Sequence, residues 1–307
     1  MDTNVWTSNT VINAITNGNP NLEMVLGNYF KGFIVRVMDS EIHVQGMKAI
    51  EQLYQKVLEG IESLEVLRKE FLNVVETFAV SNHPLLKSLL PAFFEKLLNT
   101  YDEKGINLFT GTNADVLRND HFRFFNQFLF ISITKVLLEN QCFETLQTVL
   151  HARFKVYCKS YGVVREVNFI RYYGYNYTLN EFLNTESPKR ISKTADYIRK
   201  FSSQSDFVNL IKTDILLYYT SLWHHSDDFF DTNWFPELSV YNHESQILPY
   251  LVSKAYFEKA KVLFDVKTID QYRALLDVTQ DTLERSGLYR VPTLKTGLLY
   301  DTVGSMD

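Results

Sequence analysis

Cysteine is nearly absent from this chain of 307 residues, which contains only Cys142 and Cys158. The two do not form a CxxC pair, so the spacing that builds structural zinc sites is missing. Neither stands beside a histidine, so a cysteine nucleophile activated by an adjacent histidine is not indicated. A disulfide is therefore neither required nor excluded, and we expect the hydrophobic core to hold the fold together.

Glycine and proline are also sparse, with 12 and 7 residues, and the glycines are scattered singly. The chain has no GxxxxGK[ST] loop and no GxGxxG turn, the glycine-rich segments that cradle the phosphates of nucleotides. It also lacks the GxSxG elbow on which many hydrolases carry their serine. These absences argue against a nucleotide-binding α/β fold and remove most common classes of enzyme.

Long apolar runs and long basic runs are missing as well. No apolar run reaches the roughly 18 to 20 residues that a membrane span needs, and no basic region followed by an apolar block opens the chain. We therefore expect a cytoplasmic protein with no membrane segment. The formal net charge of −5, without a block of lysine and arginine, argues against a broad nucleic-acid surface, so nucleic acid is not an expected partner.

Aromatic residues, in contrast, are abundant: 23 phenylalanines and 18 tyrosines make up most of a 14% aromatic share. The longest stretch that must be buried runs from Asp120 to Phe154. Its apolar side chains recur at helical spacing from Phe122, and further phenylalanines widen that stripe almost to the full circumference of a helix. A break near Asn140 precedes a second, one-sided stripe that ends at Phe154. We predict two antiparallel helices with a short connection, wrapped by the rest of the chain.

Helical periodicity also predicts helices over residues 20–37, 47–80, 84–98 and 205–222, with two more between 247 and 287. Gly60 is expected to bend or split the second of these, and Pro91 to kink or interrupt the third. The β-branched and aromatic residues of 163–173 favour a short strand. The predicted fold is mainly α, a multi-helix bundle or stacked helical hairpins with at most a short β element.

For domain organisation, we predict a polar N-terminal segment over residues 1–19, at best partly ordered. A helical region over 20–158 and a second over 159–307 follow, and the alternative is one continuous domain.

The densest polar cluster is a DDxxD pattern made by Asp227, Asp228 and Asp231, preceded by His224. On a helix, aspartates one turn apart can hold a divalent cation through oxygen ligands. Terpene synthases and prenyltransferases use this pattern for a magnesium-bound diphosphate, but prenyltransferases carry two such motifs and this chain has one. The alternative is a helix that ends near these residues and a solvated loop. No cofactor is predicted, and the hypothesis of a bound divalent metal rests on this cluster alone.

A second hypothesis concerns Arg36 and His43. Ribonucleases of the HEPN type place an arginine and a histidine four to six residues apart, and six residues separate this pair. His43 falls in a predicted break and not in one helix with Arg36, so convergence of the two side chains is not assured. The alternative is an ordinary surface pair.

Two aromatic segments, Arg171 to Tyr175 and Trp234 to Tyr241, suggest an interaction surface with Arg171, Trp234 and Tyr241 as anchors, because these residue types dominate interface energetics. The alternative, which we favour, is that these aromatics fill the gap between helical layers. In that arrangement Arg171 would pair with a buried carboxylate such as Asp214.

Four segments together carry a resemblance: Asp120–Leu150, Asn168–Tyr173, Lys212–Trp223 and Asn233–Tyr241. The chain resembles uncharacterised bacterial helical proteins of defence-type (anti-phage) loci, in which such a module accompanies an effector. The resemblance implies a sensing or scaffolding module and brings no catalytic residues.

The sequence therefore leads us to expect a non-enzymatic interaction, sensor or scaffold protein with a protein partner or a homo-oligomeric state. A metal-dependent or HEPN-like hydrolase or ribonuclease is the alternative.

Overall fold

The computed structural model describes residues 7–43, 47, 49–100, 117–158, 162–223, 233–283 and 290–307. Within them the protein is mainly helical, and its one sheet is an antiparallel pair of strands. The predicted fold class is therefore confirmed. Within the same residues, no helix combines the length and apolarity that a membrane crossing requires.

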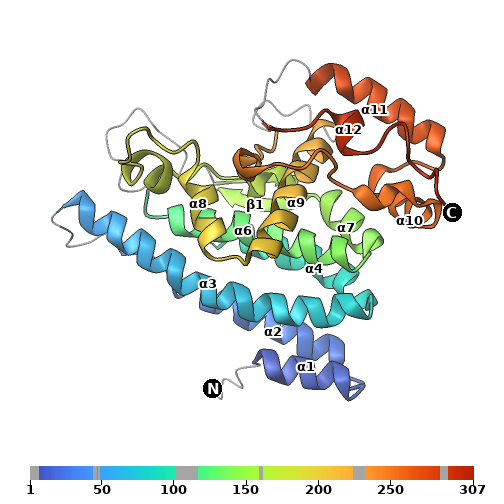
Figure 1. Ribbon diagram of the computed structural model, residues 1–307. Coiled ribbons are helices and arrows are strands. Elements are labelled where there is room, and N and C mark those ends of the chain that lie inside the picture. The colour runs from blue at the N-terminus through green and yellow to red at the C-terminus, as the bar shows by residue number, and fades with distance from the viewer. Residues whose placement is uncertain are drawn as a thin grey trace.

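Three helices form the N-terminal part of the molecule, which Figure 1 shows at the lower side of the view: α1 (Ser8–Thr16), α2 (Leu22–Met38) and α3 (Ile50–Val80). We predicted a polar segment over residues 1–19 and no helix within it, yet residues 8–16 form one. There Thr7 caps the helix by accepting from the Thr10 amide, and Val11 and Ala14 are buried. Two apolar side chains suffice because α1 packs against both α2 and α3.

The centre of the molecule is α6 (Asp120–Glu139), and each of its residues from 120 to 138 is buried except the half-buried Lys135. α3 runs along it, while α4 (Pro84–Leu98) and α7 (Phe143–Leu150) complete the layer around it. Buried Arg68 of α3 donates to Ser132 of α6, and its guanidinium lies 3.7 Å from the ring centre of Phe128. The predicted wrapping of this helix is confirmed.

Two strands follow, β1 (Phe154–Cys158) and β2 (Val163–Val167), paired antiparallel with Phe154 opposite Val167 and Cys158 opposite Val163. A strand was expected over 163–173, and β2 occupies the start of that range. Phe154 was assigned to the helix before it, and this is wrong because α7 ends at Leu150. β1 packs against α4, and its Phe154 and Val156 side chains are buried, with the Phe154 ring centre 5.9 Å from that of Tyr172.

The rest of the chain alternates short helical turns with two longer helices, and its elements are η1 (Phe169–Tyr172), η2 (Thr178–Phe182), α8 (Lys193–Lys200), α9 (Gln204–Trp223), η3 (Glu237–Tyr241), η4 (Pro249–Val252), α10 (Lys254–Ala260), η5 (Lys261–Phe264), α11 (Ile269–Leu283) and α12 (Leu294–Gly297). α9 packs on α6, and α10 to α12 gather near the C-terminus (Figure 1). The last residues return to the start of α10, where the Lys254 amide donates to the Met306 carbonyl. One continuous hydrophobic cluster joins residues of 20–158 to residues of 159–307.

Gly60 lies in the interior of α3 and does not split it, since the helix is continuous from Ile50 to Val80. A Cβ atom added at Gly60 would lie 2.9 Å from Cδ2 and 3.0 Å from Cγ of the buried His121 ring. His121 is fixed in turn, because its Nε2 lies 2.9 Å from the Ser40 carbonyl oxygen. Glycine is therefore needed here for the close approach of α3 and α6, at the cost of some helix propensity.

Substituting Gly60→Ala should lower the free energy of unfolding by about 1 to 3 kcal/mol, because the His121 ring must move within a packed core. The matched control is Gly32→Ala in α2, where an added Cβ meets nothing within 4 Å. That change should raise stability by roughly 0.5 to 1 kcal/mol through helix propensity. Urea unfolding measures both, and equal effects of the two changes would contradict the role assigned to Gly60.

Candidate functional site

An aromatic surface forms where residues 173–177 meet the segment that precedes η3. We call Tyr173, Tyr175, Tyr177 and Phe235 the tyrosine face. The three tyrosines are half-buried, and Phe235 is 42% exposed. Ring centres lie 6.1 Å apart for Tyr173 and Phe235 and 4.9 Å apart for Tyr175 and Tyr177. Burial, followed by the nearby Glu237 carboxyl, raises the pKa of Tyr173, so this phenol stays neutral.

The N-terminal turn of α6 holds the segment that carries the three tyrosines of the tyrosine face. Asp120 accepts from Arg123 Nη1 at 2.6 Å and from the Thr178 amide at 2.7 Å. Asn176 donates through Nδ2 to the Asp120 carbonyl at 2.8 Å. Gly174 allows the chain to pass close to Arg123, since an added Cβ would lie 3.3 Å from the arginine Cβ. The tyrosines therefore stand on a segment whose backbone is tied to the central helix.

The sequence-predicted anchor Trp234 is part of the core and not of the surface. Its side chain is 0% exposed, and its indole Nε1 donates to Asp214 Oδ1 at 2.7 Å. The other oxygen of Asp214 accepts from the Leu238 amide at 2.8 Å. Asp214, which we considered as a partner for Arg171, is thus held by the Trp234 indole and the Leu238 amide. Trp234 therefore packs in the core between helical layers, which is the alternative that we favoured from the sequence.

The other two predicted anchors are half-buried. Arg171 lies in η1, and Tyr241 ends η3, where its hydroxyl donates to Asp196 and the Arg199 guanidinium lies 5.0 Å from its ring centre. Tyr241 is thereby fixed to α8, while the exposed aromatic of this region is Phe235. The chain neighbours of Phe235, Trp234 and Pro236, are both buried. The sequence pattern did not indicate that Phe235 would be the exposed residue of the three.

Beneath the tyrosine face lies Glu237, which is buried and has no lysine or arginine partner among its described hydrogen bonds. Asn180 and Gln127 approach its carboxyl group at 3.4 and 3.5 Å. Burial, and then the nearby Asp214 carboxylate, raises the pKa of Glu237 to about 8. Within the described residues Gln127 Oε1 is buried and has no hydrogen-bond donor, so after a rotation of its amide it can accept a hydrogen bond from the protonated Glu237 carboxyl group. We therefore treat Glu237 as a neutral acid at pH 7.

The two residues of the HEPN-type hypothesis have different surroundings. Both Nη atoms of Arg36 donate to Glu70, at 2.8 and 2.9 Å, and its guanidinium lies beside the rings of Tyr29 and Phe33. His43 is exposed and follows the end of α2. Arg36 thus already has a bidentate carboxylate partner on α3.

The metal candidates His224, Asp227, Asp228 and Asp231 lie outside the described residues. Inside them, no group of three or more histidine, cysteine, aspartate or glutamate side chains could hold a metal ion together.

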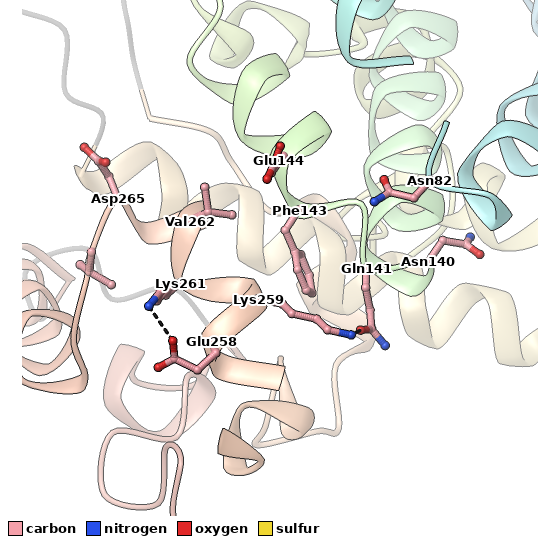
Figure 2. Close-up of a pocket in the computed structure, with 11 residues that line it drawn as sticks. Asn82, Asn140, Gln141, Phe143, Glu144, Glu258, Lys259, Lys261, Val262 and Asp265 are labelled. Atoms are coloured by element: carbon pink, nitrogen blue, oxygen red, sulfur yellow. Dashed lines mark hydrogen bonds and ion pairs between the residues drawn. The ribbon is translucent and has the colours of Figure 1, made fainter. Parts of the chain in front are cut away.

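A polar groove of about 580 Å³ opens where the C-terminal ends of α3, α6 and η5 meet. Figure 2 shows that Lys259 reaches toward Gln141 from the opposite wall and that Lys261 pairs with Glu258. Three of its lining residues follow helix ends with a positive φ: Asn82, Gln141 and Asp265. Because its lysines already have partners within the groove, we assign it no ligand.

Comparison of the chain with protein-family models, with curated proteins and with solved structures finds no match. The class that the fold and the tyrosine face define is a mainly helical protein with an aromatic surface supported by a buried polar network.

Stability should depend on pH through Glu237. Its pKa in the folded chain, about 8, exceeds the ordinary value of 4.5, so between these values the folded state binds more protons than the unfolded state. The free energy of unfolding should therefore fall as the pH rises from about 5 to 8, by up to roughly 1.4 kcal/mol per pH unit for this group. Asp214, whose pKa burial raises to about 7, adds to the same trend.

Glu237→Gln should reduce that slope, because the amide keeps the shape and cannot ionise. The control is Glu76→Gln, which removes an exposed carboxylate from α3. Denaturant unfolding at several pH values measures both variants. A slope that Glu237→Gln leaves unchanged would show that Glu237 is not the titrating group.

Proposed function

We propose that the protein is a cytoplasmic interaction module, a sensor or scaffold without chemistry of its own, and that the tyrosine face contacts its partner. The observation that supports this proposal most is that exposed Phe235 lies among half-buried tyrosines. A buried hydrogen-bond network holds the segments that carry these side chains. Tyrosine and other large aromatics supply much of the energy of interfaces. A surface that is already ordered loses less conformational entropy on binding.

The setting of Arg36 supports the same proposal. In a HEPN-like ribonuclease this guanidinium would have to reach substrate phosphate, yet Glu70 occupies it with two hydrogen bonds. The resemblance to helical proteins of anti-phage loci supports a sensing or scaffolding role beside an effector, with either that protein or a second copy of this chain as partner.

The test is affinity purification of the tagged chain from its native cells, followed by light scattering to determine the stoichiometry. Phe235→Ala should reduce recovery of the partner at least tenfold, because the exposed ring would be an interface anchor. Its melting temperature should stay close to that of the parent. The matched control is Val80→Ala, which shortens a 72% exposed side chain at the end of α3 and should retain the partner.

Equal partner recovery with Phe235→Ala and Val80→Ala would remove the tyrosine face as the contact surface. A purified chain that turns over a substrate, with the activity lost in a single polar variant, would overturn the non-enzymatic proposal itself.

A further inference from the structure

The two edges of the β1–β2 hairpin differ in how their backbone groups are satisfied. On the outer edge of β1, the Lys155 amide donates to Glu95 Oε2 at 2.8 Å, and the Tyr157 amide donates to Asn99 Oδ1 at 2.9 Å. Asn99 Nδ2 donates in return to the Lys155 carbonyl at 2.9 Å. The side chains of Glu95 in α4 and of Asn99, the residue that caps the C-terminal end of α4, thus take the place of a third strand on that edge.

These hydrogen bonds determine which backbone groups of β2 face away from β1. Because Lys155 and Tyr157 direct their backbone groups toward α4, the residues of β1 that bond to β2 are 154, 156 and 158. Their partners in the register are 167, 165 and 163. The N–H and C=O groups of Val164 and Glu166 therefore face the outer edge of β2. Neither residue has a hydrogen bond there within the part of the chain that the structure describes.

The side chains of the hairpin are also unusually exposed for a sheet. Val164 is 60% exposed, its cross-strand neighbour Tyr157 is 51% exposed, and Val163 is 42% exposed. In β2 only Val167 is buried. Proteins commonly protect strand edges with charges, proline, bulges or a covering segment, and a two-stranded sheet gains stability from a third strand.

We infer that the open edge of β2 accepts an extended segment of a partner protein, which adds a third strand through the backbone groups of Val164 and Glu166. This surface is separate from the tyrosine face and goes beyond the proposed function. Strand addition is a known mode of peptide recognition, in which main-chain hydrogen bonds supply affinity and side chains supply specificity.

Charge argues against a second copy of the chain as the occupant. Full antiparallel pairing of β2 with itself places Arg165 directly opposite Arg165 of the other copy, and like charges in that position destabilise a sheet. A heterologous strand avoids this when it carries an acidic residue opposite Arg165. A basic residue opposite Glu166 and a β-branched residue opposite Val164 complete the complementary pattern.

A synthetic peptide containing Thr-Lys-Glu-Val-Thr serves as the probe. In antiparallel pairing it sets lysine opposite Glu166, glutamate opposite Arg165 and valine opposite Val164. The lysine and valine N–H groups then point toward β2, while the glutamate N–H points away. Fluorescence anisotropy with the full chain measures binding. N-methylation of the lysine and valine amides should weaken binding about tenfold or more, and N-methylation of the glutamate amide should change it little.

On the protein side, Val164→Pro removes an N–H that does not bond to β1, so the hairpin should persist, as proline is tolerated on such an edge. It should weaken peptide binding roughly tenfold. Val164→Thr keeps the backbone N–H and should bind within about threefold of the parent. Circular dichroism of both variants checks that the fold is intact.

The proposal fails if the unmodified peptide does not bind up to its solubility limit. It also fails if all three peptides bind alike, or if Val164→Thr weakens binding as much as Val164→Pro does. A dimer in light scattering that Val164→Pro converts to monomer would show that the occupant is a second copy, and this too would overturn the proposal.

Discussion

The burial of a carboxyl group at the start of the central helix is the constraint on which most of this structure depends. Asp120 is fully buried, and burial raises its pKa while Arg123 and the Thr178 amide act in the opposite direction. An unpaired carboxylate in such a place would cost several kcal/mol, so its partners must be supplied by the fold. One comes from the next turn of α6 and the other from a segment 58 residues away.

The same requirement extends along the irregular half of the chain, where side-chain amides stand in for regular secondary structure. Asparagines accept from or donate to backbone groups of other segments, among them Asn99, Asn176, Asn180, Asn184 and Asn242. Asn180, for example, accepts from the Lys193 and Thr194 amides at the start of α8 while its Nδ2 lies 3.4 Å from Glu237. The segment between β2 and α8, which contains only the short turns η1 and η2, is thereby made rigid enough to hold aromatic side chains at fixed positions.

The sequence predicted the buried central helix better than it predicted the candidate site, because only the helix has a periodic pattern of apolar residues. The width of the apolar stripe around Phe128 predicted that α6 would be wrapped, because a helix that is apolar on all sides must be buried. α1 was missed because only Val11 and Ala14 of its residues are buried. The site was harder to predict. Aromatic content drew attention to Trp234, which is core, whereas Phe235 beside it is exposed, and adjacent residues of an irregular segment have no periodicity that distinguishes them.

The central claim is that Asp120 positions the segment that carries the tyrosine face, and hydrogen exchange in the Asp120→Asn variant tests it most directly. The amide of asparagine turns a donor toward either Arg123 or the Thr178 N–H, so one existing bond is lost. We predict that amides of residues 176–183 exchange about tenfold faster or more, while those of 71–80 in α3 keep their protection. Unchanged exchange in 176–183, or an equal increase in both segments, would contradict the account.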